Sequence, residues 1–324
     1  MTVLEVSGLR VIFPVRSGAR RRWAPAVDGL SFSIERGRAF GLVGESGSGK
    51  TMTGLSLLGL VPPPGRVGGS IRLLGRELVG MQEREWWDVR GRHVTMVFQD
   101  ALSALNPVRT VGSLLEEAVR RHYAGFPGAL ARGWVRERAV EALADAGVPR
   151  PGERLGAYAH QLSGGLRQRV MIALATVHRP ALVVADEPTT ALDNTLQAQV
   201  LDLLRGLLPT SSLLLVTHDL GVAAAICDDL AVVYAGRMAE SGPTERVLTA
   251  PRHPYTAALL AAVPRLGAAA PARAIPGQAP ALGAVPPACA FAPRCPRAIP
   301  HCSRVRPPLE PVDGRLAACW NPVP

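Results

Sequence analysis

The sequence predicts an α/β fold built on a mainly parallel sheet, followed by a small separate element at the C-terminal end. Three observations support this prediction. Short apolar runs typical of buried strands alternate with longer helical segments over residues 1–250. Polar residues suited to bind phosphate or metal follow several of these runs, as in sheets that bind ligands at their strands' carboxyl ends. From residue 251 the composition changes, and four cysteines follow an alanine- and proline-rich stretch.

The first part of the chain predicts strands at residues 3–11, 27–34, 39–43 and 94–98. The run at 39–43 ends in a glycine-rich turn, as a buried central strand would. Residues 52–60 predict a helix, which the prolines from Pro62 onward end. The run at 94–98 leads directly into Gln99.

The second part predicts a mainly helical stretch over residues 111–155, then a helix that Ser163 caps and that runs to about residue 177. Further strands are expected at residues 181–185 and 213–216, and a further helix at 196–208. We therefore expect one domain over residues 1–250, with a helical part at about 108–161. An extension over residues 251–324 contains a linker at 264–287.

The composition favours a globular protein, because 48% of the 324 residues are hydrophobic. We find no uncharged apolar stretch of about 18 residues that would span a bilayer, and no signal peptide at the start, so we expect a cytoplasmic protein. The formal net charge of +10 invites a nucleic-acid function. We discount it because the basic residues are scattered arginines, typical of a solvated surface; docking to an acidic membrane or partner is the alternative.

Residues 44–51 match the phosphate-binding pattern G-x-x-x-x-G-K-[ST] between an expected strand and an expected helix. Backbone N–H groups of such a loop, with the positive end of the helix, surround the β-phosphate of a nucleotide. Lys50 is the only lysine in the sequence, which suits a site too narrow for a guanidinium group. It would reach the β- and γ-phosphates, and the Thr51 hydroxyl would bind Mg²⁺. We expect ATP to bind Gly44, Glu45, Ser46, Gly47, Ser48, Gly49, Lys50 and Thr51.

The second motif is an acidic pair that follows the apolar run ending at Ala185. Asp186 would hold Mg²⁺, and Glu187 would polarise the water that attacks the nucleotide. An acidic pair after a strand is only moderately specific alone, but together with the loop at 44–51 it predicts ATP hydrolysis.

Residues 162–169, Leu-Ser-Gly-Gly-Leu-Arg-Gln-Arg, predict a helix start where two glycines allow close approach of an anion. This run resembles the signature motif of ATP-binding-cassette (ABC) proteins. The resemblance implies that two cassettes enclose two ATP molecules, each signature motif contacting the γ-phosphate bound by the other subunit. The residues that would make this contact are Ser163, Gly164, Gly165 and Gln168.

The resemblance to ABC proteins covers about residues 2–262 and includes further positions. Gln99 resembles the Q-loop glutamine that senses Mg²⁺, the attacking water and the transmembrane partner. Asp193, within Ala191-Leu192-Asp193, resembles the D-loop residue at the subunit interface, and His218 resembles the switch histidine at the γ-phosphate. Phe13 could stack on adenine or belong to the core.

The same resemblance implies a P-loop ABC ATPase domain, with a parallel-sheet core, an antiparallel β subdomain and a helical subdomain. It implies catalytic roles for Lys50, Gln99, Glu187 and His218, ATP-binding roles for Asp186 and Asp193, and Mg²⁺ binding by Thr51, Gln99 and Asp186.

Several runs resemble, more narrowly, the ATPases of dipeptide/oligopeptide importers: residues 97–100, 105–107, 160–165, 185–193 and 253–256. This implies a peripheral protein on the cytoplasmic face of the membrane. The implied partners are a second ABC ATPase subunit (identical or a paralogue), two transmembrane permease subunits and an extracytoplasmic substrate-binding protein. Close relatives import nickel or glutathione, so the cargo stays open.

Four cysteines lie in the C-terminal extension, separated by five, six and sixteen residues: Cys289, Cys295, Cys302 and Cys319. A reducing compartment disfavours disulfides, and the short spacing usual in zinc sites is missing. Four thiolates on a loop-rich segment would suit a [4Fe–4S] cluster. The resemblance of residues 289–295 to the C-terminal region of the importer class also implies one, with a structural role. Zinc, with His301, and unligated thiols are the alternatives, and Cys227 is expected to be an ordinary buried thiol.

Two other functions compete with the energising subunit of an importer. One is a soluble ABC ATPase acting on nucleic acid or ribosomes, suggested by the net charge, although we expect no nucleic-acid partner. The other is a regulatory module that binds ATP without hydrolysing it. The presence of both Glu187 and His218 argues against that module.

Overall fold

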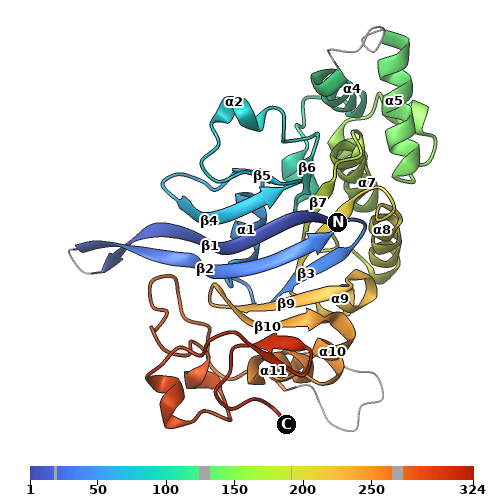
Figure 1. Ribbon diagram of the computed structural model, residues 1–324. Coiled ribbons are helices and arrows are strands. Elements are labelled where there is room, and N and C mark those ends of the chain that lie inside the picture. Colours follow the sequence, from blue (N-terminus) through green and yellow to red (C-terminus); the bar gives the residue numbers. More distant parts are fainter. Residues whose placement is uncertain (18–19, 124–131, 191, 265–272) are drawn as a thin grey trace. The chain divides into compact units, whose positions relative to one another are not determined.

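Strands and helices alternate along the chain in the computed structural model, which describes residues 1–17, 20–123, 132–190, 192–264 and 273–324 (Figure 1). The residues pack as two compact units. We call the first the helical unit; it comprises Met1, Glu35–Arg38 and Gly80–Leu214. We call the second the sheet unit; it comprises Thr2–Ile34, Ala39–Val79 and Leu215–Pro324.

The sheet unit contains an antiparallel sheet in the order β2-β1-β4-β5. Its strands are β1 (Thr2–Ser17), β2 (Arg20–Glu35), β4 (Arg66–Leu73) and β5 (Arg76–Glu77). Buried Leu4 lies opposite Leu73, and buried Val6 lies opposite Ile71. Alternate apolar residues therefore share one covered face, as period-two patterning requires. The antiparallel subdomain is confirmed, and its first two strands are longer than the sequence predicts.

A second group of strands in the sheet unit carries the phosphate-binding loop. The fully buried β3 (Ala39–Val43) pairs in parallel with β9 (Asp229–Tyr234), which pairs antiparallel with β10 (Arg237–Pro243). The hairpin of β11 (Glu310–Val312) and β12 (Arg315–Ala317) adds to the edge of β10, with Ala317 opposite Glu240. The helices of this unit are α1 (Lys50–Ser56), α9 (Leu220–Ile226), α10 (Thr244–Thr249) and α11 (Pro254–Ala262).

The C-terminal extension thus continues the sheet of the preceding residues through β12. The cysteine-bearing segment contains two short 3₁₀ turns, η2 (Ala292–Arg294) and η3 (Pro300–Ser303). Of the expected linker, residues 265–272 lie outside the described part of the chain. The boundary at residue 250 stays a prediction, and β10 and β12 are where the two predicted parts join.

The helical unit contains the parallel pair β6 (Val94–Val97) and β7 (Leu182–Asp186), with Thr95 opposite Val183. Its main helices are α4 (Val111–Tyr123), α5 (Arg132–Asp145), α7 (Gly164–Thr176) and α8 (Asn194–Gly206). Shorter ones are α2 (Glu83–Trp86), α3 (Ala101–Ala104), α6 (Pro151–Arg154) and the 3₁₀ turn η1 (Ala159–Gln161). Leu115, Val135 and Val170 belong to one buried cluster from α4, α5 and α7, so this core explains the helical region that the sequence predicts.

The division between the units passes within β8 (Ser212–Thr217), whose six residues are all buried. Within the described part of the chain, none of the helices is both long and apolar enough to cross a membrane.

Candidate active site

The phosphate-binding loop is a tight turn between β3 and α1 that requires glycine at two places. Gly44 has φ 152° and Gly49 has φ 100°. A Cβ at Gly44 would lie 2.2 Å from the Val233 carbonyl oxygen, and one at Gly49 would lie 2.4 Å from that of Ala26. Because both obstacles are backbone atoms, a side chain at either position would displace the loop.

Lys50 lies along this loop and is only 5% exposed. Its Nζ donates hydrogen bonds to the carbonyl oxygens of Gly44 (2.7 Å) and Glu45 (3.0 Å) and to the Ser48 hydroxyl (3.4 Å). The Ser48 carbonyl in turn accepts a hydrogen bond from the Gly236 N–H (2.9 Å), which ties the loop to the turn between β9 and β10. A cation at the start of α1 complements the anion-binding character of a helix N-terminus.

Two other predicted residues of the sheet unit lie where the sequence places them. His218 directly follows β8 and is exposed, and the next residue, Asp219, caps α9 by accepting from the Gly221 N–H (2.7 Å). Phe13 is half-buried on β1, and a Cβ at Gly65 would lie 2.6 Å from its ring. The Phe13 ring therefore packs on the turn before β4. Its contact with adenine, like that of His218 with the γ-phosphate, stays a prediction.

The acidic pair of the helical unit ends β7. Asp186 is 4% exposed. Glu187 has φ 45°, a left-handed conformation that is uncommon outside glycine and often occurs at functional sites. Its Oε2 accepts hydrogen bonds from the Gln99 amide (3.3 Å) and the Thr190 hydroxyl (2.9 Å). The structure therefore brings Gln99 and Glu187 together, and it adds Thr190, which the motif analysis missed.

The predicted signature residues lie at the start of α7. Ser163 is its N-cap and accepts from the Leu166 N–H (3.4 Å), as predicted. Gly164 is exposed, whereas Gly165 is buried. Gln168 is only 4% exposed, and its Nε2 has no hydrogen-bond partner among the described residues. The exposed positions of Ser163 and Gly164 suit contacts with a nucleotide, and the burial of Gly165 and Gln168 does not favour such contacts. The nucleotide contacts of all four residues stay predictions.

Asp193 caps α8, because its Oδ1 accepts a hydrogen bond from the Leu196 N–H (2.9 Å). Its predicted neighbour in the D-loop, Ala191, lies outside the described residues. The carboxylate thus has a local structural role, and its contact with a second subunit stays a prediction.

The expected Mg²⁺ ligands offer the oxygen donors that this ion prefers. Thr51 is exposed at the second residue of α1, Asp186 ends β7, and Gln99 follows β6. Thr51 belongs to the sheet unit and the other two to the helical unit. The donor chemistry fits the ion, and the joint binding of Mg²⁺ by the three residues stays a prediction.

The iron–sulfur expectation is not supported. Cys302 is buried, and Cys289, Cys295 and Cys319 are half-buried. Burial raises the pKa of the Cys289 and Cys295 thiols and raises the pKa of Cys319 to about 11, with the neighbouring cysteines adding to each shift. No three His, Cys, Asp or Glu residues of the described chain are grouped to hold a metal ion. The zinc alternative meets the same objection.

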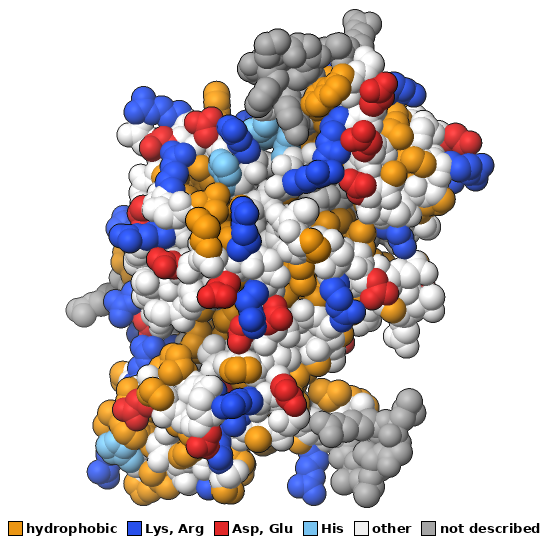
Figure 2. All heavy atoms as spheres, turned by 45° about the vertical axis from the view of Figure 1, so that its right-hand side comes forward, with side chains coloured by type: hydrophobic (Ala, Val, Ile, Leu, Met, Phe, Trp, Pro, Cys, Tyr) orange, Lys and Arg blue, Asp and Glu red, His pale blue; other side chains and the backbone are white. Residues whose placement is uncertain are grey.

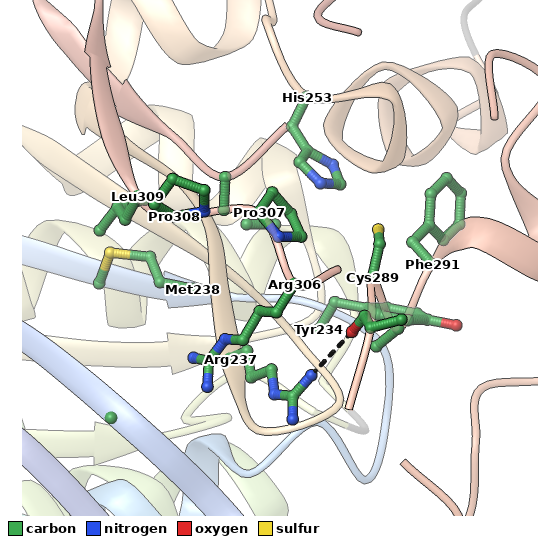
Figure 3. A pocket seen from close by; sticks show the side chains of 15 residues that line it. Tyr234, Arg237, Met238, His253, Cys289, Phe291, Arg306, Pro307, Pro308 and Leu309 are labelled. Carbon is green, nitrogen blue, oxygen red and sulfur yellow. Dashed lines mark hydrogen bonds between the residues drawn. The ribbon is translucent and has the colours of Figure 1, made fainter. Parts of the chain in front are cut away.

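A cavity of about 290 Å³ lies beside this segment, within the sheet unit (Figure 3). Tyr234, Met238, His253, Cys289 and Phe291 are among its lining residues. The Arg237 guanidinium beside it donates hydrogen bonds to the carbonyl oxygens of Pro286 (3.0 Å) and Ala288 (3.1 Å). These bonds fasten the segment before the first tail cysteine to β10.

Comparisons with known proteins agree with this geometry. A family model described as ABC transporter matches residues 27–190, and one described as oligopeptide/dipeptide transporter, C-terminal region, matches residues 239–302. The chain is 44% identical over 325 residues to the oligopeptide transport ATP-binding protein OppD of Salmonella typhimurium, covering 99% of this chain and 94% of that protein. It is 42% identical over 328 residues to the dipeptide transport ATP-binding protein DppD of Escherichia coli, covering 100% and 98%.

A solved structure with a similar fold is a dimeric ATP-binding cassette in a post-hydrolysis state, bound to ADP and Pi. Its TM-score is 0.64 at 25% sequence identity, and the likeness covers 74% of this chain and 98% of that one.

Proposed function

Because the chain belongs to the ABC transporter family, as an ATP-binding protein of the oligopeptide/dipeptide importer class, we propose that Glu187 positions the water that attacks ATP. The protein is an ABC ATPase that couples ATP hydrolysis to transport. The observation that carries the proposed role is the Glu187 carboxylate, which Gln99 and Thr190 both hold by hydrogen bonds. These hydrogen bonds already restrict the rotation of the carboxylate, so orienting a water molecule costs little further entropy.

The phosphate-binding loop supplies the electrostatic part of the reaction. Its N–H groups and Lys50 hold the β- and γ-phosphates, where negative charge develops in the transition state. Thr51, Gln99 and Asp186 would hold Mg²⁺, which when bound supplies further neutralisation of the phosphate oxygens. His218 contacts the γ-phosphate.

A second cassette completes each site in this proposal. Ser163 and Gly164 lie exposed at the start of α7, where backbone N–H groups can donate hydrogen bonds to a phosphate bound by another subunit. The dimeric state of the solved relative supports the pairing. The partner cassette is either a second copy or a paralogue, and closure of the pair around ATP drives the membrane subunits.

We propose peptides as the cargo, because the relatives are named for oligopeptide and dipeptide transport. Nickel and glutathione are the competing cargoes within the class. The remaining partners are two transmembrane permease subunits and an extracytoplasmic substrate-binding protein, with this chain peripheral on the cytoplasmic face of the membrane.

The distribution of charge supports the importer over an ATPase acting on nucleic acid or ribosomes. Arg120 pairs with Glu116 (2.9 Å) and Arg138 pairs with Glu141 (2.9 Å) on the helical unit. On the face in Figure 2, acidic side chains are interspersed among the basic ones. That face does not concentrate positive charge in one stripe, as phosphate-backbone binding requires.

The helical unit offers a surface for the permease contact that we propose near Gln99 and residues 108–161. A cavity of about 290 Å³ in this unit is lined by Trp86, Trp87, His122 and His178, among others. Trp87 is 60% exposed. Burial is the main cause that lowers the pKa of His122 and of His178. Arg90 and Arg121 also line the cavity, which therefore combines two cationic groups with aromatic surface and suits a partly apolar partner helix.

The test is ATP turnover by the complex purified with its permeases. Glu187→Gln keeps the size of the side chain and removes its charge, so we expect kcat to fall at least about 100-fold while ATP binding is retained. Glu5→Gln, at an exposed position of β1 in the sheet unit, is the matched control and should hydrolyse ATP like the unaltered protein. Equal turnover by the Glu187→Gln complex would exclude the proposed role.

A further inference from the structure

The C-terminal extension contacts the phosphate-binding loop through an ion pair whose arginine side chain is buried and whose glutamate side chain is 26% exposed. Arg294 lies between Cys289 and Cys295, and Glu45 is the second residue of the loop. Arg294 Nη1 donates to Glu45 Oε2 (2.8 Å), and Nη2 donates to Oε1 (2.9 Å). Both residues belong to the sheet unit. This paired geometry is the most specific that a guanidinium and a carboxylate can form.

The Arg294 side chain is itself fixed on several sides. Only 7% of it is exposed. Its Nε donates to the Pro276 carbonyl (2.8 Å), and Nη1 also donates to the Tyr234 hydroxyl (3.2 Å). Its guanidinium carbon lies 5.7 Å from the centre of the Tyr234 ring and 5.9 Å from that of Phe291, two residues that line the cavity in Figure 3. The guanidinium therefore cannot follow Glu45 freely; it holds the carboxylate at one place.

A second residue of the extension holds the backbone of Glu45. The Glu45 N–H donates to the hydroxyl oxygen of Tyr255 (2.8 Å). Tyr255 is fully buried in the first turn of α11 and packs against Tyr234 and Phe291. The N–H and the carboxylate of Glu45 are thus both fixed by residues beyond position 250.

The backbone carbonyl of Glu45 is its third polar group and contacts Lys50. Its carbonyl oxygen accepts a hydrogen bond from Lys50 Nζ (3.0 Å). A shift of Glu45 therefore moves an acceptor of the ammonium group, together with the loop N–H groups on either side.

We propose that Arg294 and Tyr255 are positioning residues that hold the phosphate-binding loop, through Glu45, in the shape that binds ATP. The extension is then a structural part of the nucleotide site. This inference rests on the proposed ATPase function. A positioning role differs from a role in stability alone. It requires that breaking the Arg294–Glu45 pair weakens ATP binding even when the stability of the chain is unchanged.

The experiment is a double-mutant cycle on the full-length chain, with Arg294→Gln, Glu45→Gln and the double variant. The dissociation constant for Mg-ATP is measured by titration with a fluorescent ATP analogue and competition with ATP. We expect each single variant to bind about tenfold more weakly, within the hundredfold that misplacing a site group can cost. The double variant should bind no more weakly than the weaker single variant, because both changes break one contact.

Arg297→Gln is the matched control. This arginine lies on the same segment, and its side chain donates hydrogen bonds to Asn321 and Pro322 rather than to the loop. It should bind ATP like the unaltered chain. Should Arg294→Gln fail to fold, as judged by its melting temperature, Glu45→Gln decides alone, since it leaves the C-terminal segment unchanged.

Unchanged ATP affinity in Glu45→Gln or in a folded Arg294→Gln, or additive losses in the double variant, would overturn the proposal. In the assembled complex, a positioning role predicts a rise of about tenfold in KM for ATP with kcat largely kept. A wild-type complex without ATP turnover would instead refute the proposed function. Normal wild-type turnover with unaltered Arg294→Gln kinetics would refute only the positioning role.

Discussion

Among single residues, His253 shows how burial fixes the charge of a side chain. It is 4% exposed at the N-cap of α11, where its Nδ1 accepts a hydrogen bond from the Tyr255 N–H (3.0 Å). Burial lowers the pKa of His253 to about 4, against the opposing effect of a hydrogen bond with the Ala318 backbone. The ring is therefore neutral at pH 7, and its acceptor nitrogen caps the helix that carries Tyr255.

The lowered pKa of His253 predicts a loss of stability in mild acid. An unfolded chain protonates this histidine below about pH 6.5, whereas the folded chain does so only near pH 4. The unfolded state therefore binds more protons in this window, and the free energy of unfolding falls as the pH drops from 6.5 towards 4. Between pH 7 and pH 5 the contribution is about 2 kcal/mol.

Urea unfolding of His253→Asn at both pH values tests this. Asparagine keeps a capping acceptor but does not titrate, so the loss between pH 7 and pH 5 should shrink by about 2 kcal/mol. His160→Asn, at an exposed position in η1, should keep the full loss. An equal pH dependence in His253→Asn and the unaltered chain would contradict the assignment.

Local sequence was enough to single out Lys50, Asp186 and Glu187 as candidate site residues, because each stands at a fixed offset within a contiguous motif. It could not identify Arg294, whose partner is 249 residues away along the chain. Thr190 lies within the run at 185–193, and the role of its hydroxyl depends on the turn at Glu187, which the sequence does not show. Long-range contacts of this kind depend on the fold and leave no periodic pattern.

Among the elements, those with strong local signals were predicted well. The strand β3 has the predicted bounds, and α7 begins directly after its capping Ser163, because buried apolar runs and N-caps act over a few residues. The hairpin of β11 and β12 was not predicted. Its strands have three residues each and follow a proline-rich stretch, so they depend on the edge of β10 for pairing.

Arg315 fastens this hairpin to the sheet unit. Its side chain is 5% exposed, and Nη1 donates to the carbonyl oxygens of Arg246 and Ala250 at the end of α10. It also lies 3.7 Å from the fully buried Glu240 carboxylate, which accepts from the backbone N–H groups of Arg252 and His253. A cation here complements both the carboxylate and the C-terminal end of a helix.

Arg315→Met should lower the free energy of unfolding by about 3 kcal/mol, because it leaves a buried carboxylate without its cationic partner. Urea unfolding at pH 7 measures the change. Arg304→Met, at an exposed position between η3 and the hairpin, is the control and should change stability by less than about 0.5 kcal/mol. A loss below about 1 kcal/mol in Arg315→Met would mean that the hairpin is held by its strand pairing alone.

For the whole molecule, the division of motifs between two units matters for coupling. The phosphate-binding loop and His218 belong to the sheet unit, and Gln99, Ser163 and Glu187 belong to the helical unit. A motor subunit must transmit the state of its nucleotide to a membrane partner, and Gln99 is bonded to Glu187 in the unit that we propose contacts the permease. A partner docked on that unit could therefore affect the Glu187 carboxylate through Gln99.

The proposed docking surface predicts that assembly depends on Trp87. This side chain is 60% exposed beside the cavity of the helical unit, with the Arg121 guanidinium carbon 5.9 Å from its ring centre. Large aromatic residues next to arginine often carry much of an interface's binding energy, about 2 kcal/mol or more each. We expect Trp87→Ser to reduce co-purification with the permease subunits by about tenfold or more, while the isolated chain keeps its ATP affinity.

Trp23→Ser is a closely matched control for this measurement. Trp23 is 43% exposed on β2 of the sheet unit and also carries an arginine, Arg66, 4.3 Å from its ring centre. Both substitutions remove an exposed indole stacked on a guanidinium group, so a general loss of solubility or stability would affect both variants alike. Loss of the permease subunits in Trp87→Ser alone would support docking on the helical unit. Equal recovery of the permease with both variants would contradict a docking site at Trp87.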